Sequence, residues 1–233
     1  MEAQEIPIPV GTEQVSGLFL RPAGAKALYL FAHGAGAGMR HKAMESNAQG
    51  LAARGIATLR YQFPYMEKGS KRPDPPRIAH SAVRAAAAKA LELAPKLPLV
   101  AGGRSFGGRM TSQAQAIEPL PSVRGLAFLG FPIHPAGKPG VERADHLAAV
   151  RIPMLFISGE RDALAELDLL KPIVADLGPL TTLHVVASAD HSFKPAAKSG
   201  RTSADAEAEA LDALANWISA NDYFPSEPSA AFI

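Results

Sequence analysis

The stretch LVAGGRSFGGRM, residues 99–110, runs from apolar residues into a serine enclosed by glycines. It contains the pattern Gly-x-Ser-x-Gly, with Gly103, Ser105 and Gly107 at the defining positions. A serine nucleophile on a sharp strand-to-helix turn needs glycine two places before and after it, because larger side chains would collide with the turn. An apolar, strand-like run precedes the pattern and a helical segment follows it. The context therefore predicts that Ser105 is a nucleophile.

A glycine-rich phosphate loop is the main alternative interpretation. Gly103 and Gly108 have the spacing of such a loop, but Arg109 and Met110 occupy the positions where lysine and serine or threonine would bind phosphate and magnesium. The second glycine-rich stretch, HGAGAGM at residues 33–39, ends in methionine where a dinucleotide-binding motif requires its third glycine. Both departures argue against nucleotide binding.

Strand-like and helical segments alternate along the chain after an opening hairpin. This alternation predicts an α/β fold with a mostly parallel central sheet and helices on both faces, and ligands bind at the C-terminal ends of the strands in such sheets. The hairpin is expected over residues 6–22, further strands near 27–32, 56–63, 97–103, 123–131, 153–159 and 181–188, and helices near 41–54, 78–93, 106–117, 164–178 and 204–220.

A serine nucleophile needs a base and an orienting acid, which follow it in the chain order Ser, Asp or Glu, His in this type of sheet. Asp162 lies just beyond one buried strand and His191 just beyond the next, so both are expected at the same sheet edge as Ser105. Asp162 also suits the N-cap of the following helix, and Glu160 or Asp190 are alternative acids. We favour Asp162 because Asp190, adjacent to the base, would have to bend back along its own chain.

The other histidines are weaker candidates for the base. His33 lies in the glycine loop, and His41 and His80 fall on predicted helices. His184 is inside a predicted strand, and His134 and His146 come before the acid in chain order. Among these, His134 is the one expected to line the site.

An acyl-transfer intermediate also needs two backbone N–H donors for its oxyanion. In this type of turn, one comes from the residue after the nucleophile, here Phe106, and the other from the loop after an earlier strand. Ala35 in the HGAGAG loop is the predicted second donor, with Gly34 or Gly36 as alternatives if the loop is one residue out of phase.

Composition limits the remaining possibilities. The chain has 233 residues and 47% hydrophobic residues, which suits one domain over residues 1–220, with 221–233 as a C-terminal tail. A net charge of +2 with scattered Lys and Arg argues against a nucleic-acid partner. The absence of cysteine excludes disulfides and a thiolate nucleophile. Without a secretory signal, a membrane-spanning run or a metal motif, we expect a cytoplasmic protein with no membrane partner, metal or cofactor.

With Ser105, Asp162 and His191 in this order, the chain resembles the α/β-hydrolase superfamily over residues 5–220. HGAGAGMRH at 33–41, followed by RGIATLRYQFPYMEKGSKRPDPP at 54–76, is similar to a branch of small predicted hydrolases. That branch is related to dienelactone hydrolases and to the α/β-hydrolase-like scaffold subunit of a eukaryotic chromatin-modifying complex. Dienelactone hydrolases use a cysteine nucleophile, so the resemblance does not imply their activity for this chain.

The segment 132–152 is too short for the helical lid that many such hydrolases insert, so no large lid domain is expected. An open cleft favours short, soluble acyl substrates, which makes a small-molecule carboxylic ester the expected substrate. A thioesterase or peptidase with the same triad, or a non-catalytic binding protein, are the alternatives. The expected substrate-pocket residues follow predicted strands: Phe63, Tyr65, Phe131 and His134.

Overall fold

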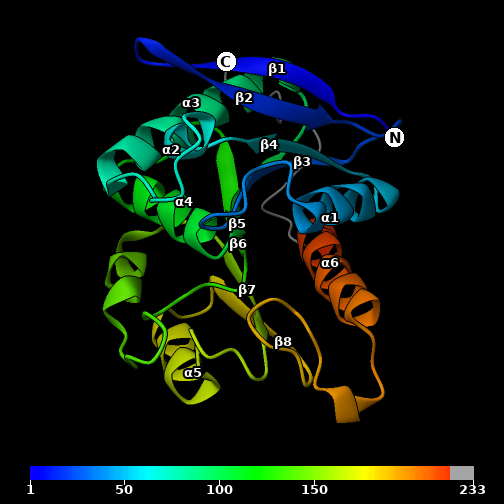
Figure 1. Cartoon of the computed structure of the whole chain (residues 1–233), viewed down its shortest axis with the longest axis vertical. Helices are drawn as coiled ribbons and strands as arrows, with labels where there is room; N and C mark the ends of the chain where they lie inside the picture. Colours follow the sequence, from blue (N-terminus) through cyan, green and yellow to red (C-terminus); the bar gives the residue numbers. More distant parts are fainter. Residues whose placement is uncertain (221–233) are drawn as a thin grey trace, which may run out of the picture.

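The computed structural model describes residues 1–220, and its centre is an eight-stranded sheet with the order β1-β2-β4-β3-β5-β6-β7-β8 (Figure 1). The hairpin strands β1 and β2 are antiparallel, β2 is antiparallel to β4, and every other neighbouring pair is parallel. The predicted mostly parallel sheet is therefore confirmed. The strands are β1 Gln4–Val10, β2 Glu13–Leu20, β3 Ala27–Ala32, β4 Ile56–Tyr61, β5 Leu99–Arg104, β6 Val123–Leu129, β7 Met154–Gly159 and β8 Thr181–Val186.

Helices cover both faces of this sheet. Helices α1 and α6 lie together on one face, and α3, α4 and α5 lie on the other (Figure 1). The residues of β3, β4 and β7 are all buried, as expected for strands covered by helices on both faces of a sheet, and β3 is apolar along its whole length. The helices are α1 Lys42–Ala53, α2 Pro64–Glu67, α3 Pro76–Leu93, α4 Phe106–Ile117, α5 Leu167–Asp176 and α6 Ser203–Ala220, with 3₁₀ helices η1 Glu142–Ala149 and η2 Ala197–Ser199.

The strand order creates a switch point between β3 and β5. These neighbouring strands are parallel, but the chain leaves β3 toward α1 on one face and leaves β5 toward α4 on the other. The two outgoing segments therefore diverge and leave a crevice at the C-terminal edge of the sheet. Ligands bind at such crevices in open α/β sheets.

Two local differences from the expected elements have simple causes. The short helix α2 was not predicted; Pro64 at its first position fixes a helical φ and needs no N–H partner. Helix α5 begins at Leu167, later than expected, because the preceding residues form a turn in which the carboxylate of Asp162 accepts the Leu164 N–H.

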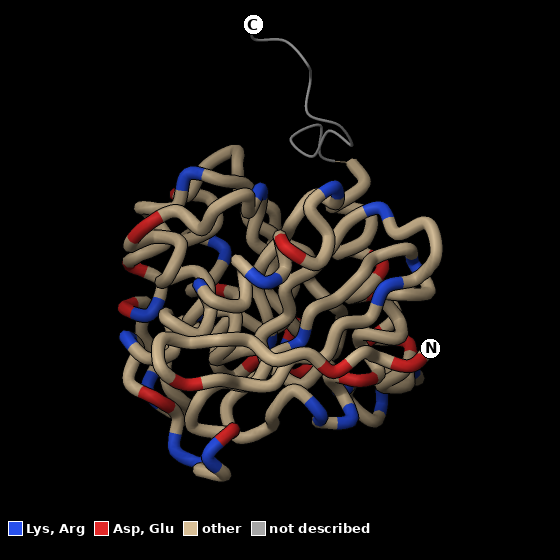
Figure 2. The backbone as a smooth tube through the Cα atoms, turned by 90° about the horizontal axis from the view of Figure 1, so that it is seen from above, with Lys and Arg blue, Asp and Glu red and all other residues tan. Residues whose placement is uncertain are grey.

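The segment between β6 and β7 contains the 3₁₀ helix η1, and no large lid is present within residues 1–220. Acidic and basic residues are interspersed along the described chain (Figure 2). None of the described helices is both long and apolar enough to cross a membrane. The segment 221–233, expected as a C-terminal tail, lies outside the described residues.

Candidate active site

Ser105 occupies a strained turn between β5 and α4. Its backbone has φ 48° and ψ −115°, in a region that non-glycine residues rarely adopt and that costs of the order of 1–3 kcal/mol. The flanking glycines make this turn possible. A Cβ on Gly103 would lie 2.3 Å from the carbonyl oxygen of Ala32, and one on Gly107 would lie 2.6 Å from the carbonyl oxygens of Ala32 and His33. Glycine is required at both positions because β3 passes too close for a side chain.

The structure brings Ser105, His191 and Asp162 together in one hydrogen-bonded chain. Nε2 of His191 lies 2.9 Å from the Ser105 hydroxyl oxygen. The opposite ring nitrogen, Nδ1, lies 2.8 and 2.9 Å from the two carboxylate oxygens of Asp162. Because a carboxylate can only accept, Nδ1 carries the proton and Nε2 is left to accept the serine hydroxyl proton. The Asp162 side chain is fully buried, whereas His191 is partly open to solvent.

The alternative acids have other partners. The carboxylate of Glu160 accepts the Ser188 backbone N–H at 2.6 Å. The carboxylate of Asp190 accepts the N–H groups of Ser192 and Lys194, which closes the turn that carries His191. Neither carboxylate is placed on the histidine ring. The N-cap of α5 is Glu166, so the helix-cap interpretation of Asp162 is wrong.

The loop after β3 lies beside the serine. Gly34 is close enough that an added Cβ would sit 3.8 Å from the Ser105 Cβ, and Ala35 lines the same cleft. The Gly36 N–H donates to the Tyr65 hydroxyl at 3.2 Å, so it is engaged away from the serine. Gly34 and Ala35 thus remain the candidates for the second donor that the sequence predicts in this loop. Phe106 is the first residue of α4, where a backbone N–H lacks a partner within the helix.

His33 holds this loop in position. Its side chain is fully buried, and Nε2 accepts the Phe63 backbone N–H at 3.1 Å. The proton must then be on Nδ1, which donates to the Gly34 carbonyl at 2.8 Å. Burial lowers the pKa of His33 to about 4, so the ring is neutral at neutral pH. His33 therefore ties the loop after β3 to the segment that follows β4.

A cleft of about 320 Å³ opens over Ser105. It combines small residues of the loop after β3 with the start of α1 and the histidine turn. Its walls are Gly34, Ala35, Ala37, His41, Ala43, Met44, Arg104, Ser105, Leu129, Leu164, His191 and Ser192. Sequence reasoning missed Arg104, Leu164 and the α1 residues. Arg104 was detectable as the neighbour of Ser105, whereas Leu164 and α1 reach the site only through the tertiary fold.

The expected substrate-pocket residues do not form the walls of this cleft. Phe63, Tyr65 and Phe131 are buried in the hydrophobic core, where Phe63 and Tyr65 pack against the Phe106 ring. His134 is fully buried with its ring on the Glu166 carboxylate. These residues lie outside the cleft walls because side chains just after a strand can point into a helix-covered layer as readily as toward the sheet edge, and a substrate-pocket role for them stays a prediction.

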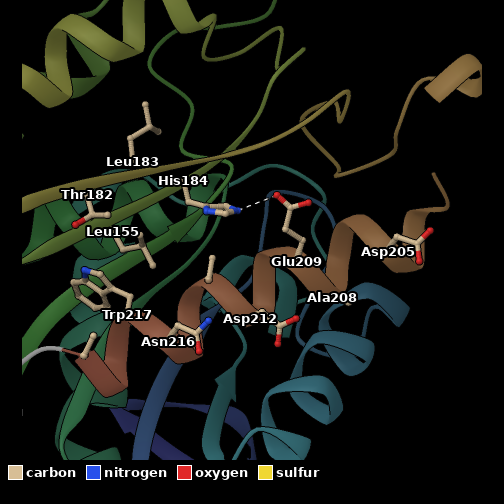
Figure 3. Close-up of a pocket in the computed structure, with 12 residues that line it drawn as sticks. Leu155, Thr182, Leu183, His184, Asp205, Ala208, Glu209, Asp212, Asn216 and Trp217 are labelled. Carbon is tan, nitrogen blue, oxygen red and sulfur yellow. Dashed lines mark hydrogen bonds and ion pairs between the residues drawn. The ribbon is translucent and has the colours of Figure 1, made fainter. Parts of the chain in front are cut away.

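A second depression, of about 690 Å³, lies between β8 and α6 (Figure 3). Leu155 and Trp217 are among the residues that line it, and His184 pairs with Glu209 at 3.0 Å, both of them also lining residues. His184 belongs to β8 and faces α6, so it is not part of the Ser105 cleft. No cluster of three or more His, Asp or Glu side chains suited to a metal ion occurs within residues 1–220.

Comparisons with known proteins agree with this architecture. A dienelactone hydrolase from Anabaena variabilis is 24% identical, with a TM-score of 0.69 over 93% of this chain and 95% of that chain. A serine hydrolase without a lid from Xanthomonas campestris is 18% identical, with a TM-score of 0.72 over 98% of both chains. The esterase domain of a Rhodothermus marinus protein is 18% identical, with a TM-score of 0.68 over 93% and 98%.

At these identities the solved structures are evidence for a shared fold. The family evidence comes from the sequence itself. A family model described as an alpha/beta hydrolase domain matches residues 25–219, which is most of the chain and includes Ser105, Asp162 and His191. The chain therefore belongs to the alpha/beta hydrolase domain family.

Proposed function

We propose that the protein is a serine hydrolase that cleaves carboxylic esters of small, soluble substrates. The observation that carries this proposal is the hydrogen-bonded chain from Ser105 through His191 to Asp162, with the serine held on a strained turn at the mouth of a cleft. A nucleophile within hydrogen-bond reach of a base that is itself oriented by a buried acid is the arrangement that acyl transfer requires.

In the proposed mechanism, the Ser105 oxygen attacks the acyl carbonyl while His191 Nε2 takes the hydroxyl proton. Asp162 fixes the imidazole tautomer and stabilises the imidazolium that forms. The N–H groups of Phe106 and Ala35 donate to the oxyanion of the tetrahedral intermediate. His191 then gives its proton to the leaving alcohol. In the second half-reaction His191 activates a water, which hydrolyses the acyl-enzyme and restores Ser105.

The size and walls of the cleft support a short acyl group. Its volume of about 320 Å³ is at the lower end of ordinary ligand pockets. Ala35, Ala37 and Ala43 leave space near the serine, while Met44 and Leu164 offer apolar surface. Residues 1–220 contain no large lid that would cover the site, so water reaches it readily. Such a site suits hydrolysis of a soluble ester better than binding of a long lipid chain.

The test is hydrolysis of p-nitrophenyl esters of increasing acyl length by the native chain and by Ser105→Ala. We expect turnover with the acetate and butyrate esters, a decline with long acyl chains, and loss of turnover in the variant. A parallel series of thioesters and peptide amides separates the ester from the other leaving groups. No turnover of any series by folded native protein would contradict the proposal.

A further inference from the structure

Arg104 stands between Gly103 and Ser105 and has no role in the mechanism above. Its guanidinium reaches out of β5 toward two other parts of the site. Nη1 donates to the side-chain oxygen of Asn47 on α1 at 2.9 Å, and Nη2 donates to the backbone carbonyl of Ser192 at 3.3 Å. The Cζ atom lies 5.4 Å from the centre of the Phe193 ring, within cation–π range. One side chain thus joins the serine turn, α1 and the turn that follows His191.

The turn that carries His191 needs such an anchor. Phe193 has φ 61°, a left-handed conformation that a bulky residue adopts only under constraint. The Phe193 side chain is nevertheless buried, and its N–H donates to the Asp190 carbonyl at 2.9 Å. A strained turn keeps its conformation only when the surrounding contacts stabilise it. Arg104 makes two such contacts, on the two residues directly after His191.

The anchor on α1 lies in a packed part of the fold. Asn47 is buried on the inner face of α1, and α1 packs on β4 and α6. Asn47 fixes one edge of the guanidinium plane, so the other edge is directed at the Ser192 carbonyl. A planar guanidinium with several donors in a fixed geometry can hold two acceptors at once, which a lysine ammonium on a flexible chain does less well.

We propose that Arg104 is a positioning residue: through Ser192 and Phe193 it holds the His191 turn against α1 and so sets the alignment of His191 Nε2 with the Ser105 hydroxyl. This inference rests on the proposed serine-hydrolase function. It assigns a task to Arg104, the residue between Gly103 and Ser105, whose identity the steric requirement for small flanking residues does not determine. A shift of about 1 Å in a catalytic group can lower turnover by about 100-fold, so loss of this tether is expected to act on kcat.

Arg104 also lines the cleft, and this predicts a different outcome if its task were to bind substrate. A substrate-binding arginine would raise KM when removed and leave kcat nearly unchanged. A positioning arginine would lower kcat with little change in KM. Its effect would also depend on the presence of His191, because Arg104 would act only through that ring.

The experiment measures kcat and KM for p-nitrophenyl acetate in Arg104→Met, Arg104→Lys and Asn47→Leu. Arg54→Met is the matched control, because Arg54 also joins α1 to another element, here α6 through Asp212 and the Ala208 carbonyl, but lies away from the cleft. Each variant is also made in a His191→Ala background, where the remaining oxyanion donors leave a residual activity. Thermal unfolding is recorded for every protein.

We expect kcat to fall by about 10- to 100-fold in Arg104→Met and less in Arg104→Lys and Asn47→Leu, with KM nearly constant. Arg54→Met is expected to lower the Tm but keep kcat. In the His191→Ala background, the change at Arg104 should add almost nothing. If Arg104→Met does not fold, Arg104→Lys supplies the same comparison.

Three results would overturn the inference. They are an unchanged kcat in Arg104→Met or, where that variant does not fold, in Arg104→Lys; a raised KM with intact kcat; and an equal loss with and without His191. Failure of the proposed function is distinguishable from failure of this inference. In the first case the native protein itself would show no Ser105-dependent turnover, whereas in the second it would turn over substrate and only the variants would depart from expectation.

Discussion

The substitution Gly107→Ala has two opposite effects on the free energy of unfolding, a gain from helix preference and a loss from overpacking, and the structure predicts that the loss is larger. Alanine is favoured over glycine inside a helix by about 1 kcal/mol, and Gly107 is the second residue of α4. The new Cβ, however, would lie 2.6 Å from two backbone carbonyl oxygens, those of Ala32 and His33. Backbone atoms cannot rotate aside, so we assign the upper end of the usual overpacking cost, about 3 kcal/mol.

The net expectation is a destabilisation of about 2 kcal/mol, or a Tm lower by roughly 4–8 °C for a chain of this length. The strain falls on the chain leading into the HGAGAG loop, so the rate at which a fluorophosphonate labels Ser105 should fall as well. Urea unfolding followed by circular dichroism gives the free energy, and intact mass against time gives the rate.

Gly50→Ala is the control, because it is also a glycine-to-alanine change inside a helix. Its Cβ would lie 2.5 Å from Cδ1 of Leu211, the free end of a flexible side chain that can move. We therefore expect a change within about 1 kcal/mol of the native value and an unaltered labelling rate. A Gly107→Ala protein as stable as the native chain, with the same labelling rate, would refute the packing argument.

Three further predictions concern the site and its supports. Asp162→Asn should lower kcat by about 10,000-fold with folding intact, because asparagine favours the wrong imidazole tautomer; kinetics within tenfold of native would move the acid role elsewhere. Tyr65→Phe removes the hydroxyl that accepts the Gly36 N–H, so the free energy of unfolding should fall by about 1 kcal/mol, and an unchanged urea midpoint would count against that bond. Burial lowers the pKa of His33 to about 4 from 6.5, so the unfolded chain binds more protons between these values. Stability should therefore decline as pH falls through this window, by up to about 3 kcal/mol, and urea midpoints that stay flat would contradict it.

The sheet and most of its helices were predictable because burial on both faces leaves a clear signal. The short apolar runs of β3 and β7, bounded by glycine or proline, are typical of covered strands, and the glycines around Ser105 follow a pattern that is visible within five residues of sequence. Asp162 and His191 could be placed near the serine because C-terminal strand ends in a parallel sheet share one edge. The short helix α2 escaped notice because four residues carry too little periodicity.

The walls of the cleft were not predictable in the same way. Phe63 and Phe131 follow strands just as His191 does, yet both rings turn into the core. Which way a side chain points after a strand ends depends on loop geometry, and sequence periodicity says nothing about it once the strand has ended. Met44 reaches the cleft from α1, and Leu164 reaches it from the loop after β7. Tertiary packing brings these two distant segments to the serine.

The reactivity of Ser105 is the central feature of the proposed site. The decisive measurement is intact-mass analysis after fluorophosphonate treatment, with peptide mapping, on the native chain and on Ser105→Ala. We expect one adduct per chain, located on the peptide that contains Ser105 and absent from the variant. A well-folded native protein that forms no adduct, or forms it equally in Ser105→Ala, would contradict the claim that Ser105 is an activated nucleophile.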